Sequence, residues 1–417
     1  MLRHRPSSSG FRLTVTLLFA VSALGLLMTS AAFAQTKITL GTWFAQDTWE
    51  QRYGDKMALF AATHPEIDLE TLQISLHAEY AAKLLVLAAT GDLPDILMIP
   101  PEQVAPLAYS GILEDIRPWM ANDTALDTRA WIPNVVEAVH FADIMFGVPA
   151  FAVNYTYAYN KDILAERGVA PPSINEWVTW DRIREIGRRA TYDADGDGTP
   201  EIWGFYHGNT YTEMLPLLYQ SGGRVFDENM LLDIDSPQMY EGINWLLSLI
   251  RDGIHGGTRP LFYAGNVATQ RLGSWEMNNV LTVELPIGVA SGIQNKTRGE
   301  VMYITSFAMV STSRNKDAVW DFLKFWTSRE NQNLVAQGGL VPMRRDVSFP
   351  DSLRDVFTGL VNSLTTAQSY PYHIHSDYIQ RVFNSAMAPV WQLQTTPESV
   401  IPDVQRALNA YIREQGL

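Results

Sequence analysis

Apolar positions in the N-terminal quarter of the chain follow two different periods. Trp49, Tyr53, Met57 and Phe60 recur at helical spacing, whereas DILMI at residues 95–99 is a continuous apolar run, typical of a strand covered on both faces. The pattern predicts strands at 37–44, 67–74 and 95–99 and helices at 47–64 and 77–90, the second ended by Gly91. This order of strand, helix, strand, helix, strand predicts an α/β fold.

The same alternation continues to the C-terminus. Residues 144–168 are rich in strand-forming residues up to Tyr159 and then turn helical, and 304–312 form another strand-like apolar run. Amphipathic helices are predicted at 176–190, 236–253, 316–337 and 400–415. The sequence has no internal repeat and no low-complexity linker, so we expect the chain to cross between domains more than once.

Residues 1–34 have a pattern of their own. Three arginines precede an apolar run, and the small residues of Ala-Phe-Ala at 32–34 follow it. This arrangement predicts a secretory signal peptide cut after Ala34, and therefore a protein of the bacterial periplasm. An uncleaved membrane anchor is the alternative, although the apolar run is only marginally long enough to span a bilayer.

Length and charge narrow the function classes. A chain of 417 residues is too long for one compact core, which favours two domains. The formal net charge is −14 and becomes −17 without residues 1–34, so nucleic acid and anionic lipid are poor partners. The absence of cysteine excludes a disulfide scaffold and thiol chemistry, and we expect a monomer.

Two carboxylates, Asp92 and Asp95, lie three positions apart beside Pro94 and raise the possibility of an acid/base pair. Pro94 makes the preceding residue extended, and Asp is common in turns between a helix and a strand. Both residues also precede the strand, whereas ligands in open α/β sheets bind beyond the carboxyl ends of strands. We therefore interpret them as turn residues and expect the site beyond Ile99.

Seven segments in a fixed order resemble the family 1 extracellular solute-binding proteins of ABC importers, the maltose-binding and multiple-sugar-binding group. The segments are AATGDLPDIL, YSGILEDI, GVPAFAVNYTYAYNKDIL, LPLLYQSGGRVFD, GSWEM, SFAMVSTSRNKDAVWDFLKFWTS and GGLVPMRRDV. The resemblance implies a two-lobed, type II periplasmic binding protein fold with a ligand cleft between the lobes. It also implies a binding protein rather than an enzyme, which passes a carbohydrate to permease subunits in the inner membrane.

The resemblance further implies three crossings between the lobes, near 148–152, 285–288 and 338–343. One lobe would contain residues 36–149 plus 287–338, and the other 150–286 plus 339–417. Gly147-Val148-Pro149 would serve as a hinge, because short terminal segments can absorb backbone rotation.

Sugars need aromatic planes for stacking and fixed polar groups for their hydroxyls. Trp43 and Phe44 end the first predicted strand and are candidates, with core packing as the alternative for both. Trp275 in GSWEM matches the position of a stacking tryptophan in the resembling maltose-type proteins, and Ser274 and Glu276 flank it.

Glu102 and Gln103 occupy the positions at which maltose-type sequences carry Asp and Arg that hold sugar hydroxyls, so they are candidates for ligand binding. A solvated loop is the alternative. Ile99 replaces the aromatic residue that precedes this pair in those sequences, which puts maltose itself in doubt. The remaining candidates are Tyr80, Tyr155, Tyr206, Tyr211, Thr212, Gly222, Gly223, Tyr378 and Arg344. Tyr80 has a half-buried helix face as its alternative, and Arg344 either binds a ligand or caps a lobe.

DADGDG at residues 193–198 has the spacing that begins a calcium loop, with Asp193, Asp195 and Asp197 as ligands. The twelfth position is Gly204 rather than the usual glutamate, although Glu201 could substitute. An acidic turn is the alternative, and no other cofactor is expected.

Two other functions are weighed against sugar binding. An exported glycoside hydrolase needs two carboxylates across a cleft, and the sequence has no G-x-S-x-G, H-E-x-x-H or phosphate-loop motif of other enzymes. A binding protein for glycerol phosphate or another polyol derivative would need basic residues in the cleft, for which Arg344 alone is thin support.

Overall fold

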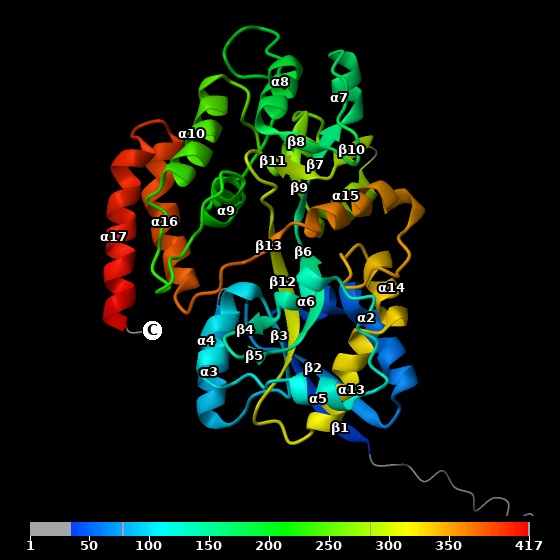
Figure 1. Ribbon diagram of the computed structural model, residues 1–417. Coiled ribbons are helices and arrows are strands. Elements are labelled where there is room, and N and C mark those ends of the chain that lie inside the picture. The colour runs from blue at the N-terminus through cyan, green and yellow to red at the C-terminus, as the bar shows by residue number, and fades with distance from the viewer. Residues whose placement is uncertain (1–34, 77–78, 284, 416–417) are drawn as a thin grey trace, which may run out of the picture.

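The computed structural model describes residues 35–76, 79–283 and 285–415 of the chain (Figure 1). The expected signal peptide at 1–34 lies outside these residues, so its cleavage stays a prediction. Among the described helices, none combines the length and the apolar character that crossing a membrane requires.

A six-stranded sheet forms the centre of what we call the first lobe, in the lower half of Figure 1. The sheet has the order β13-β12-β3-β1-β2, with β6 also paired to β12; β1, β2 and β3 are parallel, and β12 is antiparallel to β3 and β6. The strands are β1 (Thr36–Thr42), β2 (Ile67–Gln73), β3 (Ile96–Ile99), β6 (Val148–Val153), β12 (Val301–Met309) and β13 (Gln368–Ser369). All four residues of β3 are buried, which confirms the strand predicted from its continuous apolar run.

Helices cover this sheet and connect its parallel strands, as the predicted α/β order requires. The helices of the first lobe are α2 (Gln46–Thr63), α3 (Tyr80–Thr90), α4 (Val104–Tyr109), α5 (Arg117–Asn122), α6 (Pro133–Glu137), α13 (Lys316–Trp326) and α14 (Arg329–Gln337), with a small hairpin of β4 (His140–Phe141) and β5 (Ile144–Met145). Gly91 ends α3 with a φ of 78°, as expected for a glycine just past a helix.

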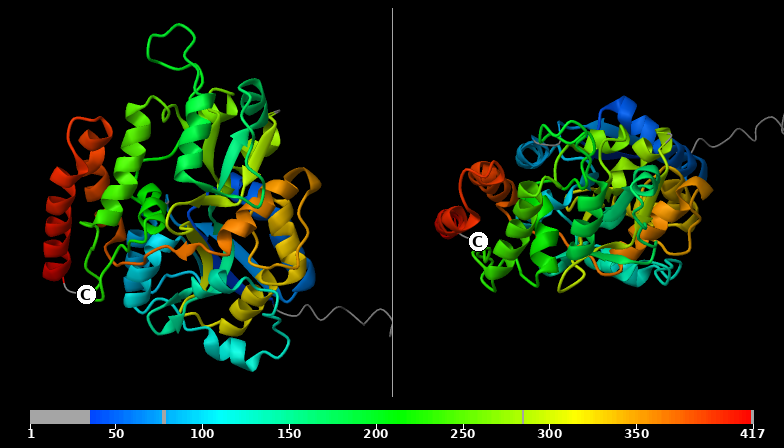
Figure 2. Two further views of the ribbon diagram at one scale, coloured as in Figure 1. Left: turned by 45° about the horizontal axis from the view of Figure 1, so that its top comes forward. Right: turned by 90° about the horizontal axis from the view of Figure 1, so that it is seen from above.

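The second lobe, in the upper half of Figure 1, is built on smaller sheets. β7 lies between β9 and β10, and β8 pairs with β11. Its strands are β7 (Tyr155–Asn160), β8 (Trp177–Thr179), β9 (Thr269–Gly273), β10 (Ile287–Ala290) and β11 (Gly292–Gln294). Its helices are α7 (Lys161–Glu166), α8 (Trp180–Ala190), α9 (Tyr211–Gln220), α10 (Pro237–Arg251), α11 (Arg259–Tyr263), α12 (Met277–Thr282), α15 (Arg354–Leu364), α16 (Ser376–Trp391) and α17 (Pro397–Gln415). In both figures, α16 and α17 pack on the outer side of this lobe beside α10 (Figures 1 and 2).

The strand pairing moves the crossings between the lobes away from the expected positions. β6 stays in the first sheet to Val153, so the chain crosses at Asn154, and β10 and β11 pair with second-lobe strands, so it returns only before Val301. Val341 still bridges to Ala152 in the first lobe, and the third crossing therefore follows it, before α15 packs on β7 and β10. Residues 287–294 thus lie in the second lobe rather than the first, and residues 150–153 and Val341 lie in the first lobe rather than the second. Between α15 and α16 of the second lobe, β13 pairs once more with β12 of the first sheet.

Two predicted helices are divided differently. The helix expected at 316–337 is two helices, because Ser328 begins α14 with its Oγ accepting a hydrogen bond from the Asn331 N–H at 3.2 Å. The helix expected at 176–190 begins only at Trp180, because residues 177–179 pair with β11 as a strand and Thr179 caps α8.

Asp95 has a structural role in the first sheet, which confirms its interpretation as a turn residue. One of its carboxylate oxygens accepts hydrogen bonds from the N–H and Oγ of Thr39 at 2.9 and 3.0 Å, and the other accepts from the Ser313 Oγ at 2.6 Å. The carboxylate thereby ties β1 to β3 and to the turn after β12.

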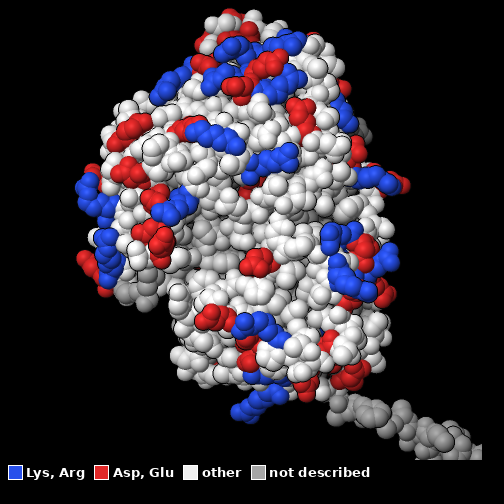
Figure 3. Space-filling view, in the orientation of Figure 1, with Lys and Arg blue, Asp and Glu red and all other residues white. Residues whose placement is uncertain are grey.

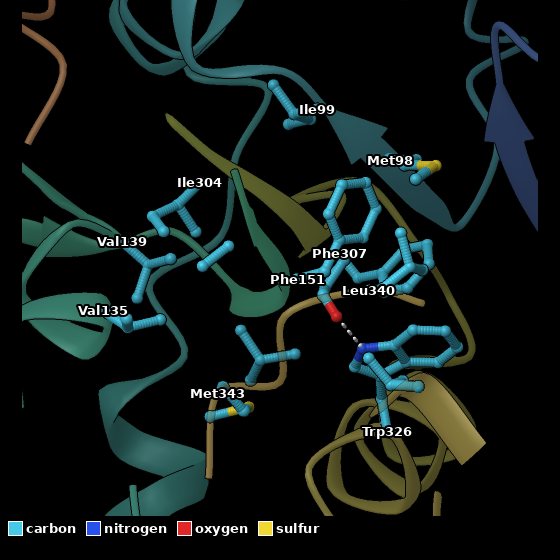
Figure 4. Packing of buried hydrophobic residues seen from close by; sticks show 14 of the residues in the cluster. Met98, Ile99, Val135, Val139, Phe151, Ile304, Phe307, Trp326, Leu340 and Met343 are labelled. Atoms are coloured by element: carbon cyan, nitrogen blue, oxygen red, sulfur yellow. Dashed lines mark hydrogen bonds between the residues drawn. The ribbon is translucent and has the colours of Figure 1, made fainter. Parts of the chain in front are cut away.

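Trp326 is the largest fully buried side chain of the first core (Figure 4). Its ring meets that of Phe307 nearly perpendicularly, with centroids 4.6 Å apart, and its indole N–H donates to the Ala150 carbonyl at 2.9 Å. This bond joins α13 to β6, so the helix is held against the strand that leads to the second lobe.

We expect Trp326→Phe to lower the free energy of unfolding by about 2 kcal/mol, because it removes a buried hydrogen bond and leaves a small cavity. Urea unfolding followed by circular dichroism would measure this. The half-buried Trp391 provides the matched control: Trp391→Phe should cost less than about 1 kcal/mol. Equal losses in the two variants would contradict the role given to Trp326.

Candidate functional site

A cavity of about 420 Å³ lies where the two lobes meet. The first lobe contributes Glu102, on the short helix η2 (Pro101–Gln103) directly after β3, and Val153 at the end of β6. Among the residues that the structure describes, the lining consists of Glu102, Val153, Tyr155, Thr212, Trp275, Tyr303, Tyr370 and Gln380. The cavity therefore lies beyond the carboxyl end of β3, where the sequence predicted a site.

Four of the eight described residues that line this cavity are aromatic. Trp275 is 37% exposed, and the Tyr155 ring meets it edge-on at a centroid distance of 4.9 Å and an angle of 88°. Tyr303 and Tyr370 form a second pair, 5.5 Å apart. Tyr155 and Tyr370 are only 4% and 2% exposed, so Trp275 offers the most open ring to a bound molecule.

Polar groups at the ring edges are held in place by neighbouring atoms. The Tyr303 hydroxyl donates to the Thr212 carbonyl at 3.0 Å, and the Gln380 amide donates to the Tyr370 hydroxyl at 3.0 Å. Oriented polar groups beside flat apolar faces can bind a ring-shaped molecule with many hydroxyls. On the face seen in Figure 3, charged side chains of both signs cover the two lobes, and the surface between the lobes is largely uncharged.

The local backbone explains how Trp275 reaches the cavity. It lies on the short helix η3 (Ser274–Glu276) after β9, and Glu276 Oε1 accepts a hydrogen bond from the Gly273 N–H at 2.9 Å, which fixes this turn. A Cβ on Gly273 would lie 2.4 Å from the indole ring, so only glycine lets the ring pack directly on the backbone. Trp275 also borders a small hollow with Arg52 and the segment 338–340 of the first lobe.

Beneath the aromatic wall, the second lobe holds a cluster of three buried glutamates, one buried arginine and the partly buried Arg259, which is 27% exposed. Arg271 on β9 is 2% exposed and binds Glu213 through Nη1 and Glu300 through Nη2, the latter at 2.7 Å. Arg259 lies 3.2 Å from Glu213 and 3.3 Å from Glu276. We call Glu213, Arg259, Arg271, Glu276 and Glu300 the buried charge cluster.

The protonation equilibria of the buried charge cluster reflect its composition. Burial is the largest single influence and acts to raise the pKa of Glu213, but Arg271, His207, Arg259 and the hydrogen bond from Tyr155 together outweigh it, so the net shift is downward. Burial raises the pKa of Glu276 and of Glu300, and the adjacent arginines offset only part of the rise. Raised pKa values for two of the glutamates are expected, because the cluster has three carboxyl groups and only two guanidinium groups to neutralise them.

The cavity includes four of the predicted ligand residues: Glu102, Tyr155, Thr212 and Trp275. Ser274 and Glu276 are buried beside Trp275 and shape its turn rather than the lining. Gln103 is buried next to Glu102. Binding by these residues stays a prediction.

Other predicted ligand residues of the first lobe lie outside the lining: Trp43 and Phe44 are partly buried and Tyr80 is fully buried. Trp43 and Phe44 pack against the first core, and the Tyr80 ring meets Trp43 edge-on at 5.6 Å. Tyr80 itself is fully buried and donates its hydroxyl to the Gly41 carbonyl at 2.7 Å. The contacts of Trp43 and Phe44 fit the alternative of core packing, whereas Tyr80 is buried more completely than the half-buried helix face given as its alternative. Ligand binding by these three residues stays a prediction.

Three predicted tyrosines of the second lobe also pack on neighbouring rings instead of lining the cavity. The pairs are Tyr206 with His255, Tyr211 with Phe383 and Tyr378 with Tyr411. In each case a ring from another segment of the lobe covers the tyrosine, which local sequence cannot show.

Arg344, Gly222 and Gly223 have structural surroundings as well. The Arg344 guanidinium binds the Asp346 carboxylate at 2.8 Å and donates to two first-lobe carbonyls, so it caps the lobe. Gly222 has a φ of 80° in the turn after α9, and a Cβ on Gly223 would meet the Leu218 side chain at 2.2 Å. The two glycines therefore serve the turn and its packing.

Four lining residues were not predicted: Val153, Tyr303, Tyr370 and Gln380. Tyr303 pairs with Val153 across β12 and β6, so both follow from a strand pairing between distant segments. The only sequence signal for Tyr370 was the aromatic-rich stretch SYPYHIH. Gln380 lies in the second turn of α16, one helical turn after Ser376, and no sequence signal pointed to it.

The Asp193, Asp195 and Asp197 carboxylates lie within 4.8 Å of one another in an exposed loop. They accept backbone hydrogen bonds from their own loop, two of them to Asp193 from the N–H groups of Gly196 and Gly198. Such bonds are typical of an acidic turn, and calcium binding stays a prediction.

A larger hollow of about 540 Å³ lies between α5 and α13, at the far end of the first lobe. It is lined by Pro118, Trp119, Asn122, Asp123, Thr124, Asp317 and Trp320. All of these residues belong to the first lobe, whereas both lobes line the cavity described above.

Burial lowers the pKa of His207, next to the buried charge cluster, to about 3, and Arg271 acts in the same direction. An unfolded histidine binds a proton below about pH 6.5, whereas the folded imidazole stays neutral down to about 3. The free energy of unfolding should therefore fall as the pH is lowered from 6.5 toward 3.

Between pH 7 and pH 4, we expect the free energy of unfolding of His207→Asn to fall by about 3 kcal/mol less than that of the wild type, because asparagine gains no proton. Urea unfolding at several pH values would measure the two slopes. Identical slopes would show that His207 is not buried in its neutral form.

The family model for "Bacterial extracellular solute-binding protein" matches residues 41–333 of the chain. Two curated relatives are a maltotriose-binding protein of Pyrococcus abyssi, 23% identical over 284 residues, and an arabinooligosaccharide-binding protein of Halalkalibacterium halodurans, 23% identical over 312 residues. Each match covers 64% of this chain, but only 58% and 66% of the respective relative.

Solved structures are similar over almost the whole chain. The sugar-binding protein MalE of Xanthomonas citri has a TM-score of 0.79 at 16% identity and covers 91% of this chain and 98% of its own. An ABC substrate-binding protein of Listeria monocytogenes in complex with cycloalternan has a TM-score of 0.78 at 20% identity, with 90% and 99% covered. At these identities the likeness confirms the predicted two-lobed α/β fold, and the family model adds that the chain belongs to the bacterial extracellular solute-binding proteins.

Proposed function

We propose that the protein binds a carbohydrate, a mono- or oligosaccharide, in the cavity between its lobes and delivers it unchanged to the permease of an ABC transporter. The observation that carries this proposal is the cavity itself, in which Trp275 and three tyrosines face a space bounded by both lobes. Its 420 Å³ lies within the range of about 300–1,000 Å³ typical of small-molecule sites.

The chemistry of the walls favours a sugar. Apolar faces of pyranose or furanose rings stack on aromatic planes, and sugar hydroxyls bond to polar groups such as the Glu102 carboxylate and the Tyr303 and Tyr370 hydroxyls. Relatives named for maltotriose and arabinooligosaccharide binding support the same class of ligand. The protein would act as a monomer in the periplasm after removal of residues 1–34.

Binding between two lobes supplies a mechanism for release to the permease. A ligand that contacts Glu102 of the first lobe and Trp275 of the second stabilises the closed arrangement through its higher affinity for that state. The short crossing segments at Asn154 and before Val301 would absorb the rotation. No covalent step is needed for this cycle.

The two alternatives find less support in the lining. Of the described residues that line the cavity, Glu102 is the one with a charged side chain, whereas an anionic ligand such as glycerol phosphate favours basic groups. A glycoside hydrolase needs two carboxylates about 5–10 Å apart across the bound sugar. Glu213, Glu276 and Glu300 lie beneath the wall and are paired with arginines.

We expect saccharides to raise the melting temperature of the protein, because a ligand at about 100 times its Kd stabilises the folded state by about 2.7 kcal/mol. A thermal-shift panel of glucose, maltotriose, arabinotriose and glycerol 3-phosphate would test this. Recovery of intact saccharide from the complex would separate binding from hydrolysis. A shift with glycerol 3-phosphate alone would overturn the carbohydrate proposal.

We expect Trp275→Ala to weaken saccharide binding by about 2 kcal/mol, roughly 30-fold, because a stacking plane is lost. Isothermal titration calorimetry would measure the affinity, and the melting temperature without ligand should change little, since the ring is 37% exposed. Trp119→Ala, in the hollow at the far end of the first lobe, is the control. Equal loss of affinity in both variants would show that the effect is not local.

A further inference from the structure

Arg271 is buried directly behind the aromatic wall of the cavity but is not part of the lining. Its side chain is 2% exposed, so a bound molecule would not touch it. A buried guanidinium must be paired and hydrogen-bonded, and its planar fork can hold two carboxylates in a fixed geometry. Whatever Arg271 does for ligand binding must therefore act through the groups that it contacts.

Tyr155 is held by Arg271 on its face and by Glu213 at its hydroxyl. The Arg271 Cζ lies 3.6 Å from the centroid of the Tyr155 ring, and the Tyr155 hydroxyl donates to Glu213 Oε1 at 3.0 Å. Glu213 in turn is bound to Arg271 through its other oxygen. This closed triangle leaves the Tyr155 ring little freedom to turn, and its edge meets the Trp275 ring.

Trp275 is also reached from a second side by the same cluster. The Arg259 Cζ lies 5.2 Å from the Trp275 ring centroid, and Arg259 binds both Glu213 and Glu276. Both neighbours of the indole, Tyr155 and Arg259, thus depend on Glu213, which depends on Arg271.

The other carboxylate on Arg271, Glu300, belongs to the segment that returns to the first lobe. Glu300 directly precedes β12, and Tyr155 directly follows the crossing at Asn154. Arg271 therefore contacts residues at two of the segments that join the lobes. Through these contacts it is connected to the Trp275 ring, on which a ligand would stack.

We infer that Arg271 is a positioning residue, which fixes the Tyr155–Trp275 corner of the cavity and ties it to the segments that cross between the lobes. The effect on affinity rests on the proposed function, whereas the effect on the position of Trp275 does not. Arg271→Lys keeps the charge but removes the planar fork that binds Glu213 and Glu300 and lies over the Tyr155 ring.

The position of Trp275 can be read without a ligand by ¹⁹F NMR of protein labelled with 5-fluorotryptophan. The chain has 12 tryptophans, and Trp275→Phe identifies the resonance of Trp275 by its absence. We expect Arg271→Lys to shift or broaden this resonance. The double variant Arg271→Gln/Glu300→Gln, which removes one charge of each sign, should do the same if the single variant fails to fold.

Arg184→Lys is the matched control. Arg184 lies on α8 of the same lobe and binds Asp252 at 2.6 Å, away from the cavity, so its replacement should leave the Trp275 resonance in place. We further expect the affinity for maltotriose, or for another saccharide of the panel that binds the wild type, to fall about tenfold in Arg271→Lys.

An unmoved resonance in the folded Arg271 variants would overturn the inference, as would an unchanged affinity. If the wild type binds no saccharide, the proposed function fails, and the resonance alone still decides whether Arg271 positions Trp275.

Discussion

β6 and β12 lie side by side in the first sheet, and both connect to the second lobe at the same end. β6 continues through Asn154 into β7, and Glu300 leads from β11 into β12. The backbone hydrogen bonds between these two strands therefore fix where the lobes meet. The cavity forms at this junction, because Tyr303 and Val153 are partners in the pairing and both belong to its lining.

The second lobe meets this junction with charged groups that are mostly hidden from solvent. Removing Arg271 and three glutamates from water costs several kcal/mol per ion, and packed apolar residues would fill the same space at similar or better stability. Apolar residues, however, form no directional hydrogen bonds, whereas the guanidinium fork of Arg271 holds its partners at set distances and angles. The buried charge cluster is thus best understood by the geometry that it imposes on Tyr155 and Trp275.

Much of the fold was predictable, because it depends on local periodicity. The apolar run at 95–99 and the glycine at 91 predicted β3 and the end of α3. Which aromatic residues line the site was less predictable, since Trp43 and Trp275 both follow strands and only Trp43 is covered by a ring from a later helix. Tyr303 and Tyr370 belong to the lining through strand pairing over long sequence distances, which no local pattern records. The break between α13 and α14 had a local signal, the capping Ser328, that periodicity alone overlooks.

The position of β12 in the sheet also constrains the order in which the molecule can assemble during synthesis. Met309 pairs with Ile96, and Phe307 pairs with Val148, so the first sheet stays incomplete until most of the chain has been translated. The hydrophobic core of the second lobe can be completed only later still, because it includes Phe383, Leu408 and Ile412 near the C-terminus. Contacts between such distant segments make folding slow, since the loops between them must close first. Neither core can therefore be completed while the chain is short, and an incompletely folded polypeptide is one that can be threaded through a narrow channel.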